Sequence, residues 1–506
     1  MIGLLVAITV ALHLATSWRY GYFRDELYFI ECARHLAWGY VDQPPLVAAA
    51  AWLSGFAGYS LVTLRLLPVL SAGATVGVAC LTARELGGGR FAQALTGLAV
   101  MLVPAYLLLG NALTTTAFEP LSWTLAAYAV IRLIRSGEPR WWLALAAGVA
   151  FGLYGKYSML LLVIALAAGV VLTPARRRLA TWWFPASAAL TALLVAPNAL
   201  WQYAHGWPML TVLHGDVLNR HAFNNGVELE YHGLLRNAAA FALEQVVYVS
   251  PLILPIWLTG LAALLVGRLA PYRAIGMAYL VLFAMAVVLD AKGYYIIGIY
   301  AVLVAAGSVT IERAAGARRG ARAAVLGALA VLSLPLVPFS LPVLPVDTFI
   351  GYTAALHLTG TGGAPPRLMQ PFYAEEFGWD GLARRVAEVY HALPPDVRAR
   401  TGLFADTYAD AGALAFYGPR YGLPAVISGQ NTFYLWGTHG YDGSSMIAVG
   451  AMQTEILRRS FRHVRLVATY GNAYKWVVEG PTPIYLCSDP VAPLPELWPR
   501  FRWYGA

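Results

Sequence analysis

Acidic side chains gather in a long segment, from about residue 18 to 60, which lies between two apolar stretches. Asp25 and Glu26 open a stretch with helical spacing of apolar residues, and Asp42 follows about one helix length later, just before Gln43. A carboxylate at such a boundary can accept the proton of a hydroxyl, and two carboxylates can hold a divalent cation. For Asp25 and Glu26 taken alone, helix capping is the simpler interpretation, because the helix dipole stabilises acidic residues in a first turn.

The residues that follow Asp42 favour catalysis over capping. Pro44 and Pro45 fix an extended turn and restrict the residue before them. Another apolar stretch, a candidate re-entrant segment, then precedes the next long apolar span. We therefore expect a rigid site in which Asp25, Glu26 and Asp42 are the candidate catalytic residues.

Two of the three lysines in the chain stand at expected turns beside tyrosines. Lys156 lies between two apolar spans, and Lys292 precedes Tyr294 and Tyr295. A lysine at a helix end often extends its ammonium to the membrane surface, and this is the simple interpretation. The chain uses arginine for that purpose, however, so these turns predict the binding of an anion such as a phosphate headgroup.

The segment from about residue 202 to 243 is rich in polar side chains and is a candidate substrate-binding loop. It includes His205, His214 and Asp216, whose spacing matches no metal-binding motif that we can defend. Ordinary polar loop residues are the simpler interpretation of all three, and His205 is also a candidate for substrate binding. The sequence holds no glycine-rich phosphate loop or nucleophile elbow in the context that each requires.

The composition of the chain indicates which solvent surrounds these residues. Of 506 residues, 59% are hydrophobic and 12% are charged, with a mean hydropathy of +0.60. Soluble domains carry about 25% charged residues, so most of this chain needs lipid as its solvent. The net charge of +9 comes with arginines in short loops between apolar segments, as is typical of cytoplasmic loops. Nucleic acid is therefore not an expected partner.

The apolar stretches predict an α-helical polytopic membrane protein with about eleven transmembrane helices. The first stretch is interpreted as a helix and not as a signal peptide, because no basic region precedes it and no cleavage site follows it. The predicted spans are 2–17, 62–84, 91–110, 115–134, 141–155, 157–173, 180–202, 244–266, 273–290, 294–312 and 321–340.

Charge alternation predicts the orientation of these spans. If the N-terminus is cytoplasmic, every short loop on that side is basic, as the positive-inside rule requires. The basic residues of these loops are Arg84, Arg90, Arg132, Arg135, Arg140, Arg176, Arg177, Arg178, Arg268, Arg273, Arg313, Arg318, Arg319 and Arg322. The opposite loops hold most of the acids, and they also hold Lys156 and Lys292. An odd number of spans then places the C-terminal region outside, and we expect the cell membrane as the location.

The apolar pattern ends near residue 340. Residues 341–506 are mixed in polarity and rich in Pro, Gly and Tyr, which is typical of a globular domain. We therefore expect a transmembrane domain over residues 1–340, including the first outer loop 18–60, and an extracytoplasmic α/β domain over residues 341–506.

The first outer loop resembles that of the lipid-phosphate-sugar-dependent glycosyltransferases of the GT-C fold, through the residues FRDELYFIECARHLAWGYVDQPPL. That family includes the bacterial family 39 enzymes related to protein O-mannosyltransferases and to the lipid A aminoarabinose transferase. The resemblance continues in GLYGKYSMLLLV, PNALWQYAHGWPML, KGYYIIGIYAVLVAAG, YADAGALAFYGPRYGLP and ISGQNTFYLWG. These motifs touch most of the chain in the right order, which makes them more specific together than any one alone.

The resemblance implies roles for individual residues. Asp25 matches the base that activates the acceptor hydroxyl, and Asp42 matches the acidic residue ahead of the Pro-Pro turn. Gln43 stands where the aminoarabinose transferase has a lysine near the donor phosphate, so Lys292 becomes the better candidate for that role. The implied donor is a polyprenyl-phosphate sugar, and the implied acceptor is a hydroxyl of a glycan, lipid or protein.

Inverting sugar transfer agrees with these residue types. The reaction needs a base for the acceptor and positive charge for the departing lipid phosphate. Because the leaving group is anchored in lipid, the site must open to membrane lipids at headgroup depth. No cofactor is certain, and a divalent metal ion bound by Asp25 and Asp42 remains an open alternative.

Two other functions remain open on the sequence. A transporter or flippase of lipid-linked sugars concentrates ionisable residues inside its helices, often in repeated halves. Here the centres of the spans are almost free of charge, Glu119 near the start of one span is the main exception, and we find no repeat. An inactive scaffold of the same fold is disfavoured only by the presence of Asp25 and Asp42.

Overall fold

The computed structural model describes residues 1–223, 234–356, 369–474 and 480–505. The chain forms two compact units. The first unit consists of residues 1–18, 65–200 and 229–343, and the second of residues 19–64, 201–228 and 344–506. Packing thus groups the first outer loop with the C-terminal residues, whereas its position in the sequence predicted that it belongs with the transmembrane segments.

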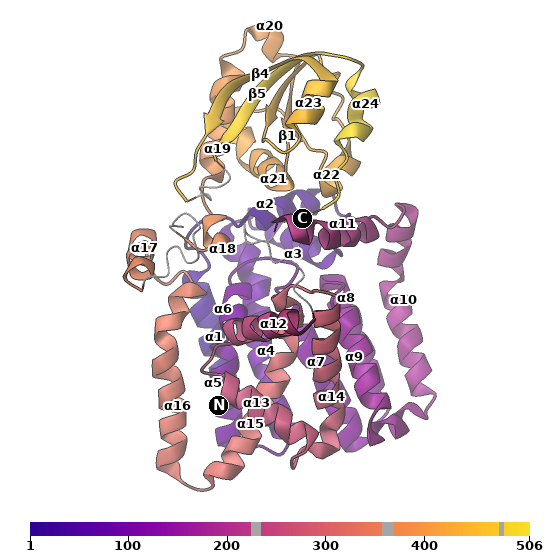
Figure 1. The fold of residues 1–506 in the computed structure, drawn as a ribbon, viewed down its shortest axis with the longest axis vertical. Coiled ribbons are helices and arrows are strands. Elements are labelled where there is room, and N and C mark those ends of the chain that lie inside the picture. Colours follow the sequence, from indigo (N-terminus) through magenta and orange to yellow (C-terminus); the bar gives the residue numbers. More distant parts are fainter. Residues whose placement is uncertain (224–233, 357–368, 475–479, 506) are drawn as a thin grey trace. The chain divides into compact units, whose positions relative to one another are not determined.

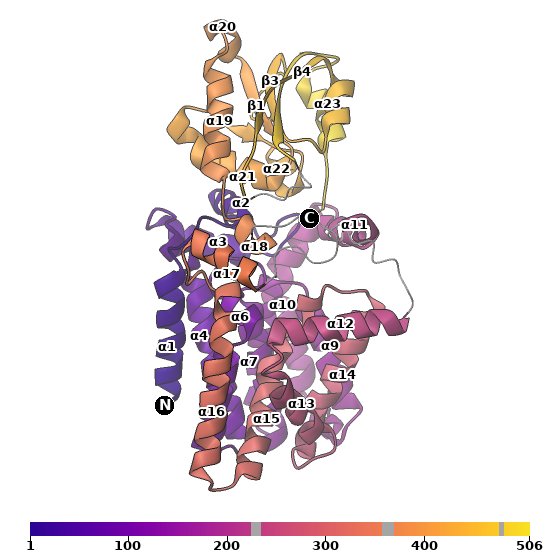
Figure 2. The same ribbon diagram turned by 60° about the vertical axis from the view of Figure 1, so that its left-hand side comes forward.

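The first unit is a bundle of mostly apolar helices, many of which run side by side in both views (Figures 1 and 2). Every predicted span coincides with one or more of these helices. They are α1 (Ile2–Thr16), α4 (Leu61–Glu85), α5 (Arg90–Met101), α6 (Pro104–Leu109), α7 (Glu119–Ser136), α8 (Arg140–Gly155), α9 (Met159–Val171), η1 (Pro174–Leu179), α10 (Trp183–Ala204), α12 (Leu234–Val249), α13 (Leu254–Leu265), η2 (Ala270–Tyr272), α14 (Arg273–Val288), η3 (Gly293–Ile299), α15 (Tyr300–Ala315), α16 (Arg319–Ser333) and η4 (Leu334–Phe339).

The lengths of these helices bear on the number of spans. Within the described residues, five helical segments are long and apolar enough to cross a membrane, and α12 with α13 make a sixth if this bent pair is one span. Other apolar helices, such as α1 and α9, are shorter. The number of about eleven spans therefore stays a prediction.

Two of the predicted spans are not continuous helices. The span predicted at 244–266 consists of α12 and α13, which are bent by 116°. Ser250 at the break has a φ of +87°, and Pro251 follows it, so the α-helix cannot continue through this point. The span predicted at 91–110 breaks ahead of Pro104, which disfavours a helical residue before it. A single continuous helix was therefore wrong at both places.

Glycine allows α13 and α15 to pack closely. A Cβ atom on Gly260 would overlap the carbonyl oxygen of Leu303, and a Cβ atom on Gly307 would overlap that of Ile256. Both positions therefore require glycine. Close backbone approach at small residues is a common way for helices to associate in lipid.

The first outer loop contains two helices, α2 (Arg24–Arg34) and α3 (Leu46–Gly55), joined by the Pro-Pro turn. Helix α2 is amphipathic, and it buries Leu27, Phe29 and Ile30 completely or almost completely. It packs against α3 and against α21 (Tyr408–Tyr417) of the C-terminal region. The predicted helix and the predicted apolar segment after the prolines are both confirmed.

The C-terminal region is built on a five-stranded sheet of order β2-β1-β3-β5-β4. Strand β1 pairs in parallel with β2 and β3, whereas β5 pairs antiparallel with β3 and β4. The α/β character predicted for this region is confirmed. Its strands are β1 (Thr401–Ala405), β2 (Val426–Ile427), β3 (Ser445–Val449), β4 (Phe461–Tyr470) and β5 (Thr482–Pro490).

Further helices of the second unit lie before, between and after the strands in the chain. Phe404, Ile427, Met446, Phe461 and Phe501 form the centre of its apolar core. The helices are α11 (Pro208–Phe223), α17 (Val346–Ala355), α18 (Pro371–Ala374), α19 (Trp379–His391), α20 (Pro395–Arg398), η5 (Gly418–Tyr421), α22 (Asn431–Trp436), α23 (Thr454–Ser460), α24 (Leu494–Leu497) and η7 (Trp498–Phe501). The parallel strands matter most for the site, because β1 and β2 lead directly into α21 and toward α22.

Candidate active site

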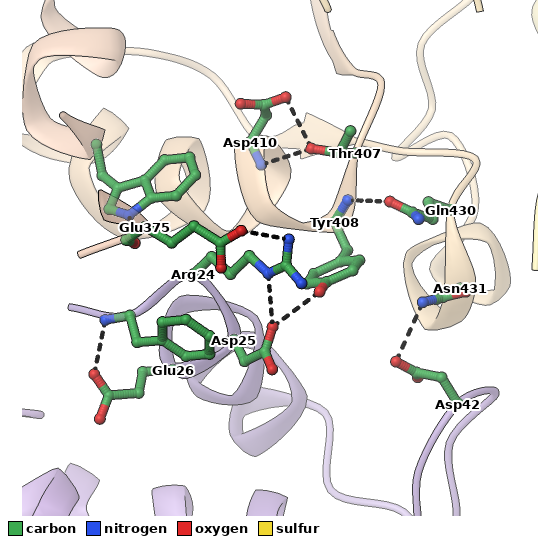
Figure 3. Close-up of polar contacts among 12 residues, drawn as sticks. Arg24, Asp25, Glu26, Asp42, Glu375, Thr407, Tyr408, Asp410, Gln430 and Asn431 are labelled. Atoms are coloured by element: carbon green, nitrogen blue, oxygen red, sulfur yellow. Dashed lines mark hydrogen bonds and ion pairs between the residues drawn. The ribbon is translucent and has the colours of Figure 1, made fainter. Parts of the chain in front are cut away.

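Asp25 lies in the first turn of α2 and is held through one of its two carboxylate oxygens (Figure 3). Its Oδ1 accepts a hydrogen bond from the hydroxyl of Tyr408 at 2.9 Å and lies 3.4 Å from Nε of Arg24. Its Oδ2 has no hydrogen-bond partner among the described residues. Because the side chain is 26% exposed, Oδ2 is an accessible proton acceptor.

Arg24 connects Asp25 to a third charged residue. Its Nη1 donates to Oε1 of Glu375 at 2.9 Å, and its guanidinium lies 5.9 Å from the centre of the Tyr408 ring. Burial raises the pKa of Tyr408 well above its ordinary value, although the charge of Arg24 opposes this shift. The Tyr408 hydroxyl therefore keeps its proton at neutral pH and acts as a donor to Asp25.

Glu26 has a structural contact that accounts for its buried position. Its Oε2 accepts a hydrogen bond at 2.9 Å from the backbone N–H of Phe23, just before α2 begins, and the residue is 0% exposed. This is a capping contact of the kind that stabilises the first turn of a helix. The simple interpretation of an acidic first turn thus describes Glu26, while Asp25 points elsewhere.

Asp42 lies in the turn after α2, and both of its oxygens are occupied. Oδ1 accepts from the hydroxyl of Tyr28 at 2.7 Å, and Oδ2 accepts from the amide of Asn431 at 3.2 Å. Burial raises the pKa of the Asp42 carboxyl to about 6, against the opposing hydrogen bonds from Tyr28 and Asn431, and the charge of Asp25 adds to the increase. The two carboxylates thus act on each other electrostatically.

Gln43 and His205 have local contacts that explain their positions. The amide nitrogen of Gln43 lies 3.5 Å from the sulfur of Cys32, and the residue is 1% exposed. His205 is exposed, stacks on Trp201 with ring centres 4.0 Å apart, and its Nδ1 lies 2.8 Å from the Trp201 carbonyl oxygen. Roles for both in substrate binding stay predictions, and the side chain of Asp216 lies outside those that are described.

The first unit contains the predicted lysine cluster. Nζ of Lys156 donates to the hydroxyl of Thr116 at 2.9 Å, and it lies 3.8 Å from Oε2 of Glu119. The same ammonium lies 4.7 Å from the ring centre of Tyr294 and 4.6 Å from that of Tyr295. Lys156 is therefore enclosed by two aromatic rings and an ion pair, as a cation removed from water requires.

Lys292 lies just before η3, which carries Tyr294 and Tyr295. It is close enough to Lys156 for the two positive charges to act on each other. The structure therefore brings the four predicted residues of this cluster together. Glu119, which the sequence analysis noted only as an exception among the spans, proves to be the counter-ion of Lys156 and also accepts from Ser158 at 2.6 Å.

A divalent cation would find few ligands near the two carboxylates. Among the described residues, no group of three or more His, Cys, Asp and Glu side chains is arranged to hold a metal ion. A cation such as calcium takes about six to eight oxygen ligands, of which Asp25 and Asp42 could supply a minority. A divalent cation bound by Asp25 and Asp42 therefore stays an alternative that these residues do not test.

Several contacts of the site were missed in the sequence. Tyr408 and Asn431 contact the two carboxylates from positions 383 and 389 residues away along the chain. Both lie in the quoted motifs YADAGALAFYGPRYGLP and ISGQNTFYLWG, which marked them as part of a resemblance without indicating a contact. Glu375 carried no such signal.

Known proteins resemble this chain in sequence over one segment and in structure over almost its whole length. Residues 42–201 match the family model described as dolichyl-phosphate-mannose-protein mannosyltransferase. No curated protein matches the chain by sequence. Asp42 and Lys156 lie inside the matched segment, whereas Asp25 and Lys292 lie outside it.

The solved structures extend the likeness beyond that segment. ArnT from Cupriavidus metallidurans bound to undecaprenyl phosphate superposes with a TM-score of 0.60 at 16% identity, covering 96% of this chain and 97% of that chain. The apo state of the same protein gives a TM-score of 0.59 at 16% identity with the same coverage. The chain thus has the GT-C fold of ArnT, and its residues 42–201 carry the sequence pattern of the dolichyl-phosphate-mannose-protein mannosyltransferase family.

Proposed function

We propose that this protein is a membrane glycosyltransferase that moves a sugar from a polyprenyl-phosphate donor to a hydroxyl, with inversion at the anomeric carbon. The observation that carries the proposal is the state of Asp25, whose Oδ1 accepts a hydrogen bond from Tyr408 and forms an ion pair with Arg24, while Oδ2 has no partner among the described residues. A carboxylate fixed in this way is prepared to accept one proton at one oxygen.

The reaction follows from the chemistry of the two residue groups. The acceptor oxygen attacks the anomeric carbon and loses its proton to Oδ2 of Asp25. The bond between the sugar and the phosphate oxygen breaks, and its electron pair leaves with the lipid phosphate. We assign stabilisation of that phosphate to Lys292, because Gln43 stands where the aminoarabinose transferase has a lysine near the donor phosphate.

Family and fold support this function over a transporter or flippase. The matched family is one of glycosyltransferases, and ArnT has been solved with undecaprenyl phosphate bound. By analogy we assign to this chain a donor of the same class, a sugar on a polyprenyl phosphate. The identity of the sugar is left undefined. The acceptor is a glycan, a lipid or a protein.

The orientation of the reaction is part of the proposal. We place the protein in the cell membrane with a cytoplasmic N-terminus and an extracytoplasmic C-terminal domain. The support is the clustering of arginines in alternate short loops, which positive-inside bias predicts.

A direct assay tests the function. The purified protein in nanodiscs is incubated with a panel of undecaprenyl-phosphate monosaccharides and a lipid or cell-envelope acceptor, and released undecaprenyl phosphate is measured. We expect one donor to give acceptor-dependent release. Passage of the intact lipid-linked sugar from one leaflet of a proteoliposome to the other, without release, would instead support a flippase.

A further inference from the structure

The C-terminal sheet domain contacts both carboxylates of the first outer loop. Tyr408 begins α21 shortly after β1 ends, and Asn431 begins α22 shortly after β2 ends. Since β1 and β2 are neighbouring parallel strands, their carboxyl ends lie at one edge of the sheet. Tyr408 contacts Asp25 and Asn431 contacts Asp42 from this edge (Figure 3).

Hydrogen bonds hold the backbone at Tyr408 and at the residue before it. The preceding Thr407 caps α21, since its hydroxyl accepts a hydrogen bond from the backbone N–H of Asp410 at 3.1 Å. The N–H of Tyr408 itself donates to Oε1 of Gln430 at 2.6 Å. The direction of the Tyr408 side chain is therefore set by the sheet domain and not by the loop that carries Asp25.

We propose that Tyr408 is a positioning residue for proton transfer, which with Arg24 occupies Oδ1 of Asp25 and leaves Oδ2 to the acceptor hydroxyl. This inference rests on the proposed function. It gives the C-terminal domain a part in the chemistry, because a residue of that domain determines which oxygen of the base reacts.

The groups around Asp25 determine how the loss of the Tyr408 hydroxyl would affect its carboxylate. The charged or titratable groups that face Asp25 are Arg24 and Tyr408, which contact it, and Asp42, which acts on it through space. Glu375 contacts Arg24 from the far side. The Tyr408 hydroxyl donates to a carboxylate oxygen, and a hydrogen bond of this kind favours the charged form of its acceptor.

The test is the pH dependence of the variant Tyr408→Phe, which removes only the hydroxyl. The loss of a hydrogen bond to a charged group corresponds to a shift of about one to two pH units. We expect the acid limb of the pH–rate profile to move up by about one pH unit or more, with an unchanged KM for the lipid donor. Release of undecaprenyl phosphate is the readout.

A matched control is available in the same domain. The hydroxyl of Tyr421 donates to both oxygens of Asp380, at 2.9 and 3.0 Å, away from the two carboxylates of the site. Tyr421→Phe removes the same kind of contact, and its profile should match that of the wild type. A purely structural role for Tyr408 would lower the yield or the melting temperature and leave the acid limb in place.

A second readout needs no substrate. Hydrophobic carbodiimides react with protonated carboxyl groups, so peptide mass spectrometry of labelled protein follows Asp25 as the pH is changed. Tyr408→Phe should extend labelling of Asp25 to higher pH by about one unit, as the same hydrogen-bond energy implies. If this variant does not fold, Arg24→Gln removes the positive charge paired with Oδ1 and should shift labelling in the same direction.

Two outcomes separate this inference from the proposed function. An inactive Asp25→Asn variant together with an unchanged acid limb and unchanged labelling in Tyr408→Phe overturns the positioning role alone. A fully active Asp25→Asn variant overturns the base assignment, and the positioning role with it.

Discussion

At the scale of single residues, the two carboxylates of the first outer loop differ in how many of their oxygens accept hydrogen bonds. Both oxygens of Asp42 accept hydrogen bonds, whereas only one oxygen of Asp25 does so among the described residues. This difference is the reason why we propose Asp25 as the base. For Asp42 we propose that it orders the loop and adds negative charge beside Asp25.

The raised pKa of Asp42 has a consequence for stability. The value of about 6, against an ordinary value of 3.8, means that folding favours the protonated form, so this contribution is present below pH 4 and is lost as the pH rises through 6. In Asp42→Asn the side chain is neutral at every pH. Between pH 4 and pH 8 the wild type should lose up to about 3 kcal/mol relative to the variant. Thermal unfolding in detergent at the two pH values measures this, and a constant difference would contradict it.

Lys292 is the residue to which we assign the departing lipid phosphate, and it lies directly before η3, which carries Tyr294 and Tyr295. We expect Lys292→Ala to weaken binding of undecaprenyl phosphate by about tenfold to a hundredfold, the value of one charge-assisted hydrogen bond. Native mass spectrometry provides the measurement, and the exposed Arg177→Ala is the control. An unchanged affinity for the lipid phosphate in Lys292→Ala would remove this residue from the site.

At the scale of elements, local sequence predicted α2, the apolar helix α3 and the positions of most helices in the first unit. Helical spacing and turn residues act over a few positions, so they are visible in the sequence. The 116° bend between α12 and α13 was not predicted. An apolar composition on both sides of Ser250 and Pro251 resembles one continuous span, and hydropathy carries no information on the direction of a helix.

The start of α2 provides a test of the role of Glu26. Because its carboxylate caps the helix, Glu26→Ala should lower stability by about 1 kcal/mol or more while the folded protein keeps most of its turnover per molecule. Melting temperature and initial rate on the same preparation separate the two effects. A variant of normal stability with no turnover would show that Glu26 is catalytic, as the sequence analysis first proposed.

At the scale of the whole molecule, long-range contacts were the part that the sequence did not predict. The composition predicted a membrane protein, and the resemblance indicated the GT-C fold that the comparison with ArnT supports. The pairing of Asp25 with Tyr408 spans 383 positions, and no periodicity or motif spacing encodes such a distance. Packing alone also places residues 19–64 with the C-terminal region.

The orientation is tested on whole cells. A cysteine introduced at the exposed Asp396 on α20 should react with a membrane-impermeant maleimide from outside, because charge alternation predicts an extracytoplasmic C-terminal domain. A cysteine at Arg177, in a short basic loop, should stay unlabelled until the membrane is opened. The reverse pattern would mean that the predicted number of spans is wrong by an odd number.

The most direct test of the proposed base compares sugar transfer by the wild type, Asp25→Asn and the control Asp396→Asn, each purified and reconstituted with the donor that the wild type uses. Removing a general base lowers rates by about 10²–10⁴-fold. We therefore expect Asp25→Asn to release undecaprenyl phosphate at least about a hundredfold more slowly, with an unchanged melting temperature, while Asp396→Asn matches the wild type. Wild-type transfer by Asp25→Asn would contradict the assignment of Asp25 as the base.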